Sequence, residues 1–427
     1  MKTTQNLIRP LSAIEQAFTL SNDALPLCVV CVLQLDACPE SQDIQLALQQ
    51  LQSRHILLQA EIVESKGDFY FSKLEPAPPI RLEIVYRTNS ATWKAIAEKA
   101  LNTIFDKKGP LMKCCAIADD ETNHSELVVC FHHAIIDGTS ARLVLHELLS
   151  LLGGLSLPTV RKSSVASKFP ADYQGWNLAK RLFAFGGRQM KDEWTYLKRG
   201  FSSTIPIHSS NAVINLLLSP EVSRKLMVHI GRKGLSLNSA LLAVMTQVIL
   251  KHKYGNVGRR LARVISFVDT RSLVTPVVGN QDLGCCISML RLTVPVADGE
   301  SVYDFAANIR REIFKSSRLG EVFLMSKVSK YLIRMTLALK KMRLGVSALS
   351  FIGKLDLQPQ YGAIQLQNVQ AFITNNQFGP DFSAFGKILF GGIGMDFTYL
   401  TAEMDETQAQ QIVTEIKEKL EEMANFA

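Results

Sequence analysis

The chain has 427 residues, of which 47% are hydrophobic and 20% charged, and its formal net charge is +8. These proportions are typical of a globular protein and exclude a largely disordered chain, while the length favours two lobes over a single hydrophobic core. The positive charge is moderate for this length, which argues against a nucleic-acid-binding protein.

The N-terminus and the cysteines indicate the compartment. No secretory signal pattern opens the chain, and no uninterrupted apolar stretch is long enough to span a bilayer. The eight cysteines include adjacent pairs in apolar segments, which is not the pattern of a secreted disulfide framework. Cys28 and Cys31 have the spacing of metal ligands, but on a strand their thiols point to opposite faces. We therefore expect a cytoplasmic protein with reduced thiols and no metal site.

Strand patterns alternate with helical patterns in the first third of the chain. Runs of β-branched and aromatic residues indicate strands, and apolar residues at spacings of three and four indicate helices. The expected elements are strands over residues 29–35, 82–85 and 127–131 and helices over residues 42–53 and 91–104. This order predicts a mixed α/β lobe.

Two histidines stand where the last of these strands ends. Because neighbouring side chains of a strand point to opposite faces, we expect one of His132 and His133 to face a cleft and the other to pack into the structure. Beyond Gly138, apolar residues keep helical spacing until Gly153 and Gly154. The motif is therefore expected at a corner between a strand and a helix.

This corner carries groups suited to proton transfer. Imidazole titrates near neutrality, so a single histidine at this corner can take a proton from an attacking hydroxyl or amine and return it to a leaving thiol. Asp137 can orient the imidazole, cap the following helix or pair with a distant arginine, and we favour a structural role. Gly138 allows close approach of the backbone. The alternative, that these residues merely end a strand, is disfavoured by the corner context.

The middle of the chain loses this order. Prolines and glycines interrupt aromatic and basic residues over residues 155–204, which indicates a crossover between lobes. The second lobe should contain a strand over residues 264–268 and helices over 238–253, 302–316 and 408–423. The predicted organisation is an N-terminal lobe over 1–155, a crossover linker over 156–205 and a C-terminal lobe over 206–427.

Two further residues are candidates for the site. Arg271 follows an apolar strand, and a guanidinium there is a good bidentate partner for a carboxylate. A solvated surface arginine is the alternative, and Asp269 is a second carboxylate within reach. Gly284 permits close backbone packing, although a plain turn is equally compatible with its surroundings.

The run from His132 to Gly138 resembles the HHxxxDG signature of the condensation-domain superfamily of acyltransferases. Nearly the whole chain shares the resemblance. The matching segments are the family's opening residues, its RHPxLR helix end, the first long helix of its second lobe, its arginine strand, its GxFxN segment and its SNLG crossover, at 9–15, 54–60, 234–243, 267–271, 284–288 and 349–355. Ser288 and Phe351 replace asparagines of the last two segments.

This resemblance implies an α/β fold of two lobes of the chloramphenicol-acetyltransferase type, which form a V with a tunnel between them. It implies that His133 is the general base and that Asp137 forms an ion pair with Arg271. The residues expected to orient the site are His132, Asp137, Gly138 and Arg271, and those expected to contact substrate are Gly284 and Ser288.

The branch most resembled contains stand-alone polyketide-associated, phthiocerol dimycocerosyl and alcohol acetyl transferases. It implies transfer of an acyl group from a thioester to a small-molecule alcohol. No Gly-rich phosphate loop is present, so the acyl group would arrive activated, as acyl-CoA or as acyl-phosphopantetheine on an acyl carrier protein, with no permanently bound cofactor. We expect a monomer.

Two alternatives stay open. One is an amide-forming condensation enzyme, and the other is a non-catalytic lipid-binding or carrier-binding protein of the same fold, which the substitutions at Ser288 and Phe351 would suit. Two basic and aromatic segments, 176–199 and 327–343, are compatible with docking of an acidic carrier protein, with coenzyme A phosphates or with peripheral contact to an anionic membrane. Each is equally compatible with a packed helix that has a solvated basic edge.

Overall fold

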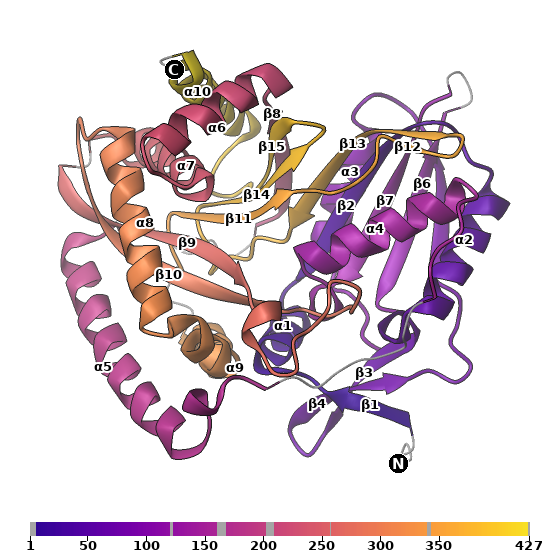
Figure 1. Ribbon diagram of the computed structural model, residues 1–427, viewed down its shortest axis with the longest axis horizontal. Coiled ribbons are helices and arrows are strands. Elements are labelled where there is room, and N and C mark those ends of the chain that lie inside the picture. Colours follow the sequence, from indigo (N-terminus) through magenta and orange to yellow (C-terminus); the bar gives the residue numbers. More distant parts are fainter. Residues whose placement is uncertain are drawn as a thin grey trace. The chain divides into compact units, whose positions relative to one another are not determined.

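The computed structural model describes residues 6–119, 123–159, 168–201, 209–256, 258–339 and 343–425. The chain divides into two compact units, and each contains segments that are distant in sequence (Figure 1). Unit 1 comprises Met1–Lys168, Arg271–Cys286 and Leu355–Thr374, and unit 2 comprises Phe169–Thr270, Ile287–Lys354 and Asn375–Ala427. This division differs from the predicted boundaries, because two segments expected in the C-terminal lobe belong to unit 1.

Unit 1 is built on a six-stranded sheet with the order β12-β13-β2-β7-β6-β5. Its strands are β12 (Gln360–Tyr361), β13 (Ile364–Ile373), β2 (Cys28–Asp36), β7 (Ser125–His132), β6 (Met112–Ala118) and β5 (Arg81–Tyr86). A smaller sheet joins β1 (Leu7–Pro10), β4 (Asp68–Lys73) and β3 (Ala60–Ser65). The helices are α1 (Ala13–Ala24), α2 (Ser41–Arg54), α3 (Thr92–Leu101) and α4 (Gly138–Leu152), with short 3₁₀ turns η2 (Ile56–Gln59), η3 (His133–Ile135) and η5 (Arg271–Leu273).

The central strands of this sheet explain the apolar sequence before the histidines. β7 is buried along its whole length and pairs antiparallel with β2, which places His132 opposite Cys28. A strand covered on both faces needs a continuous apolar run. Helix α3 contacts β2 and β7, while α4 packs against α2 and crosses in front of the strands in Figure 1. The strand and helix of the predicted corner are therefore confirmed.

Unit 2 is built on a second six-stranded sheet with the order β10-β9-β11-β14-β15-β8. Its strands are β10 (Ile287–Ala297), β9 (Arg259–Asp269), β11 (Ser347–Lys354), β14 (Phe382–Leu389), β15 (Gly392–Leu400) and β8 (Asn211–Leu217). Its helices are α5 (Gly175–Arg199), α6 (Pro220–Arg232), α7 (Leu237–Tyr254), α8 (Val302–Arg318), α9 (Glu321–Leu339) and α10 (Glu406–Asn425), with the 3₁₀ turn η4 (Ala171–Tyr173).

The side chains of β10 alternate between two environments. Leu290 and Leu292 belong to the large core that includes α7 and α8, whereas Arg291 and Thr293 bind polar side chains of α5. This period of two is the one that a strand imposes. Helices consequently cover both faces of this edge of the sheet.

Helix α5 lies within the segment that we predicted to be a crossover without regular structure. Its 25 residues are helical although Gly186 and Gly187 stand near its middle. Each glycine costs a helix about 1 kcal/mol relative to alanine. Ion pairs from Asp192 to Arg263 and from Glu193 to Arg291 tie the helix to β9 and β10 and offset that cost. The helices predicted over 42–53, 238–253, 302–316 and 408–423 are confirmed as α2, α7, α8 and α10.

The predicted basic helix over 327–343 is shorter in the structure. Helix α9 ends at Leu339, and Lys340 and Lys341 lie outside the described residues. The side chain of Arg343 is only 5% exposed: its guanidinium forms an ion pair with Glu403, lies 3.3 Å from Asp381 and donates to the carbonyl of Pro380. Arg343 is therefore an internal ion-pair residue and not part of a solvated edge.

In the described part of the chain, no single helix is long and apolar enough to cross a membrane. One strongly bent pair, α6 with α7, meets the length and composition criteria when the two helices are taken together.

Candidate active site

The strand-to-helix corner of unit 1 begins with His132, the last residue of β7 and the N-cap of η3. Its Nδ1 lies 3.1 Å from the backbone nitrogen of Ala134 and accepts that N–H, so the proton of the neutral ring is on Nε2. The side chain is fully buried, and among the described residues Nε2 has no hydrogen-bond partner. Burial, with the nearby His133 and Lys107, lowers the pKa of His132 to about 3. His132 is thus a neutral packing residue that holds the following turn.

His133 has a different hydrogen bond and therefore a different tautomer. Its Nδ1 lies 2.9 Å from the carbonyl oxygen of Ile136. A carbonyl only accepts, so Nδ1 carries the proton and Nε2 carries the lone pair. The ring stacks on Phe18 of α1 at 4.2 Å between centroids. Burial lowers the pKa of His133, against the opposing effects of the Ile136 hydrogen bond and of Asp137, so the ring is a neutral base near pH 7.

Asp137 caps helix α4 and binds an arginine from a distant segment. Its Oδ1 accepts the backbone N–H of Ser140 at 2.9 Å, and its Oδ2 lies 2.5 Å from Nη1 of Arg271. The same Oδ2 accepts the backbone N–H of Cys286 at 2.7 Å. The predicted ion pair is therefore present. Among the described residues, none of the carboxylate's hydrogen bonds goes to His133, which favours the structural interpretation of Asp137.

Ser140 links this ion pair to Gly284. Its hydroxyl donates to the carbonyl oxygen of Gly284 at 2.9 Å, lies 3.2 Å from the Gly284 nitrogen, and accepts from Nη2 of Arg271 at 2.7 Å. Gly284 thus takes part through its backbone, and the contact with substrate predicted for it stays a prediction. Gly138, the first residue of α4, follows the cap. We did not predict Ser140 from the sequence, although its place three residues after an N-cap aspartate was a local signal.

A second buried ion-pair group fixes α4 against α2. Glu147 lies in α4 and accepts from Nε of Arg54 at 2.9 Å and from Nε2 of His55 at 2.7 Å. Burial of the carboxyl opposes its charge, but these two partners prevail and lower the pKa of Glu147 to about 2. The resemblance pointed to Arg54 and His55, but nothing in the local sequence identified Glu147 as their partner.

Helix α1 also packs against the strand-to-helix corner. Ser12 and Glu15 form a capping box at its start, and Glu15 also binds Arg9 through two hydrogen bonds of 2.7 Å. The helix contacts η3 and places Phe18 against the His133 ring. The opening segment that resembles the family is therefore a support for the imidazole.

The last predicted site residue, Ser288, belongs to unit 2, on β10. It is buried, and its hydroxyl donates to the carbonyl oxygen of Val322 at 2.6 Å. That hydrogen bond gives the side chain a packing function inside unit 2. The contact with substrate predicted for Ser288 stays a prediction.

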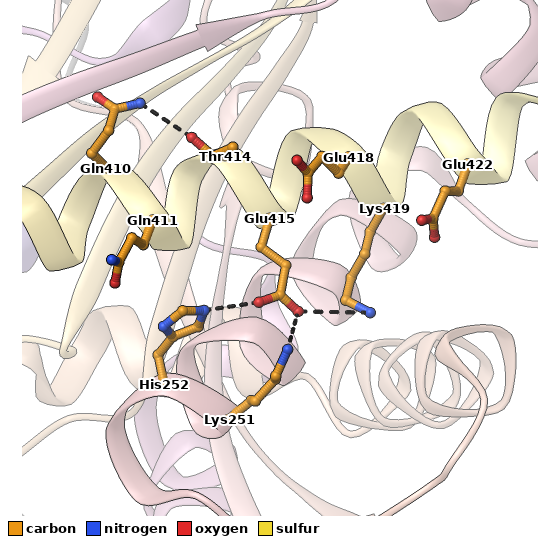
Figure 2. A pocket seen from close by; sticks show the side chains of 9 residues that line it. All are labelled: Lys251, His252, Gln410, Gln411, Thr414, Glu415, Glu418, Lys419 and Glu422. Carbon is orange, nitrogen blue, oxygen red and sulfur yellow. Dashed lines mark hydrogen bonds and ion pairs between the residues drawn. The ribbon is translucent and has the colours of Figure 1, made fainter.

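Two surface hollows lie among the described residues. One, of about 520 Å³, lies between α7 and α10, and in it Glu415 is 2.8 Å from both Lys251 and His252. Figure 2 shows these side chains pointing toward one another. Partial burial opposes the charge of Glu415, but these partners lower its pKa. The other, of about 720 Å³, is lined by Ser125 and Glu126 at the start of β7, and His132 ends that strand roughly 20 Å away. Neither hollow contains a predicted site residue.

A model of the family described as "Condensation domain" matches residues 29–425. The chain belongs to the condensation-domain family.

Solved structures with the same fold include enzymes and synthetase domains. The trichothecene 15-O-acetyltransferase of Fusarium sporotrichioides is 12% identical, with a TM-score of 0.76 over 97% of this chain and 94% of that chain. Polyketide synthase associated protein 5 of Mycobacterium tuberculosis is 14% identical, with a TM-score of 0.70 over 98% of both chains. The first condensation domain of the calcium-dependent antibiotic synthetase is 15% identical, with a TM-score of 0.69 over 97% of this chain and 96% of that domain. These likenesses confirm the predicted α/β fold.

One curated relative is similar over part of the chain. Bacitracin synthase 1 of Bacillus licheniformis is 29% identical over 157 residues, which are 34% of this chain and 3% of the synthase. The match therefore spans a small fraction of that relative.

Proposed function

We propose that this protein is an acyltransferase that moves an acyl group from a thioester to an alcohol, with Nε2 of His133 as the general base. The observation that carries the proposal is the hydrogen bond from Nδ1 of His133 to the carbonyl oxygen of Ile136. It leaves the lone pair on Nε2, and burial lowers the pKa of the ring so that it is unprotonated near pH 7. Membership of the condensation-domain family supports this class of reaction.

The proposed reaction needs no covalent enzyme intermediate. The acceptor hydroxyl attacks the thioester carbonyl carbon while Nε2 of His133 takes the hydroxyl proton. The tetrahedral oxyanion then collapses, the carbon–sulfur bond breaks, and the thiolate takes the proton from the imidazolium. The products are an ester and a free thiol, and His133 returns to its neutral form. The thioester supplies the free energy, so no nucleotide is consumed.

One experiment identifies both the acyl donor and the acceptor. Purified full-length protein is incubated with acyl-CoA or with acylated carrier protein, together with a panel of alcohols and amines, and the donors are examined by intact-mass analysis. Loss of the acyl mass with formation of an ester supports the proposal. Formation of an amide only would instead indicate the amide-forming enzyme, and binding without turnover across the panel would indicate a non-catalytic binding protein.

The variant His133→Asn tests the base. The asparagine amide can still donate to the Ile136 carbonyl, but it has no group equivalent to Nε2. We expect transfer to fall about 10²-fold to 10⁴-fold, the usual contribution of general acid–base catalysis, with binding of the donor retained. Phe18→Leu is the control, because it removes the stacked ring but keeps both ring nitrogens of His133. Wild-type turnover in His133→Asn would contradict the assignment.

A further inference from the structure

Helix α5 lies at the edge of unit 2 (Figure 1), and it exposes a row of large apolar side chains. Four of them are spaced by seven residues, and the fifth, Trp194, lies one turn from two of the others. Such spacing puts them in one stripe along the helix. The exposed fractions are 75% for Trp176, 88% for Phe183, 75% for Met190, 62% for Trp194 and 81% for Leu197.

The opposite face of α5 already attaches the helix to the rest of unit 2. Phe185 is buried in a small core with Leu324 and Met325 of α9. Asp192 and Glu193 form their ion pairs with arginines of the sheet. The outward stripe is therefore not needed to hold the helix in place. A contiguous exposed row of this kind marks an interaction surface.

Lysines run beside the stripe. At 100° per residue, Lys180, Lys191 and Lys198 lie roughly 40–60° around the helix from Trp176, and all three are exposed. The ammonium group of Lys198 lies 3.4 Å from the centre of the Trp194 ring. The two acidic residues of α5 are the ones bound to the sheet. The outward face consequently combines apolar and basic groups without an acidic one.

We propose that α5 lies on the surface of an anionic lipid bilayer, with its apolar stripe in the headgroup region and its lysines at the lipid phosphates. Tryptophan, phenylalanine and leucine on one side and lysine beside them are typical of helices that lie in a membrane interface. The stripe extends from Trp176 to Leu197, about 32 Å at 1.5 Å per residue. The lysines beside this row match the negative charge of an anionic bilayer, and a row of that length suits an extended surface.

The proposal does not depend on acyl transfer and is tested by flotation of the full-length protein with vesicles. Vesicles of phosphatidylcholine alone are compared with vesicles that also contain phosphatidylglycerol, at low and at high salt. We expect flotation with the anionic vesicles, and a decrease when salt screens the lysines. In a Trp93→Phe background only Trp176 and Trp194 emit, so a blue shift of their fluorescence on binding reports entry of α5 into the interface.

Matched variants distinguish the contribution of the stripe to vesicle binding from that of other exposed side chains. Phe183→Ser with Leu197→Ser should reduce binding at least about tenfold, and Phe314→Ser on α8, which is 63% exposed, should not. Changing Lys180, Lys191 and Lys198 to glutamine should reduce binding about a hundredfold, at about 1 kcal/mol per lysine. The charge-matched control changes Lys225, Lys315 and Lys417 of α6, α8 and α10 to glutamine and should retain binding.

Three outcomes would overturn the proposal. One is absence of flotation with anionic vesicles. Another is flotation that the stripe variant retains in full. A third is a wild-type dimer, or a complex with an acidic carrier protein, that the stripe variant abolishes while vesicle binding is absent. The substituted side chains of the stripe and lysine variants are exposed, and only Trp93 and Lys225, which belong to the background and the control, are partly buried, so unchanged circular dichroism is expected for the stripe and lysine variants.

Discussion

The Asp137 carboxylate accepts several of the hydrogen bonds that hold the strand-to-helix corner. It binds the guanidinium of Arg271 and the backbone N–H groups of Ser140 and Cys286, and both charged residues are buried. Removal of one partner from a buried ion pair leaves the other charge uncompensated, which is more costly than loss of the pair itself. The stability of unit 1 should therefore depend on the charge of Asp137 more than on its shape.

We expect Asp137→Asn to lower the free energy of unfolding by about 3 kcal/mol, because the amide keeps the cap to Ser140 but leaves Arg271 uncompensated. Urea unfolding followed by circular dichroism measures the change. The double variant Asp137→Asn with Arg271→Met should lose less than the sum of the two single variants. Additive losses would show that the two side chains do not stabilise each other.

His132 should make the protein sensitive to acid. Its pKa is about 3 in the folded state and its ordinary value is 6.5, so between these values only the unfolded chain binds the proton. Stability from this residue is therefore complete above pH 6.5 and is lost as the pH falls, by about 1.4 kcal/mol per pH unit.

The variant His132→Asn isolates that contribution. Asparagine keeps an acceptor for the Ala134 N–H but does not titrate. Urea midpoints measured from pH 7 to pH 4.5 should fall less steeply for the variant than for the wild type, whatever the stability of the variant at pH 7. Parallel slopes would mean that His132 takes up its proton in the folded state as well.

Local sequence predicted the corner but not its partners. The apolar strand, the two histidines and the helix after Gly138 are neighbours in the chain, so their spacing was sufficient. Arg271 lies 134 residues from Asp137, and only the family resemblance suggested the pair. Glu147 was missed because a carboxylate in a helix gives no local sign of a partner 93 residues away.

At the level of elements, α5 shows why a helix can escape prediction. Its apolar residues occupy two faces, one against α9 and one toward solvent, so they do not form the single stripe by which a packed helix is recognised. Two adjacent glycines weaken the helical pattern further. The contacts that stabilise the helix, from Asp192 and Glu193 to the sheet, involve residues about 70–100 positions later in the chain.

Two glycines in helical contexts should respond oppositely to alanine. Gly153 ends α4, and a Cβ built there would overlap the carbonyl oxygen of Tyr361 in β12. Gly187 in α5 has open space around it. We expect Gly153→Ala to destabilise the protein by about 2 kcal/mol through overpacking, and Gly187→Ala to stabilise it by up to about 1 kcal/mol. Melting temperatures from calorimetry test both, and an unchanged value for Gly153→Ala would contradict the close approach.

At the scale of the whole molecule, unit 1 is assembled from three separate parts of the chain. Strand β13 pairs with β2 from far earlier in the chain, with Ala371 opposite Cys31, 340 residues before it. The segment Arg271–Cys286 supplies the guanidinium and the N–H group that bind Asp137. The β13–β2 pairing and the contacts to Asp137 can form only after most of the chain has been synthesised. The corner therefore depends on contacts between residues that are very distant in sequence.

We therefore expect residues 1–168 alone to fail to fold cooperatively. Without residues 355–374 the apolar strand β2 has an open edge, and without residues 271–286 Asp137 is buried with no counter-charge. Limited proteolysis and urea unfolding of this fragment should show rapid digestion and no cooperative transition. The control carries residues 355–374 on a flexible linker, which restores the β2 edge and should give partial protection. A cooperative unfolding transition in residues 1–168 alone would contradict this expectation. It would mean that residues 271–286 and 355–374 add to a lobe that is already stable without them.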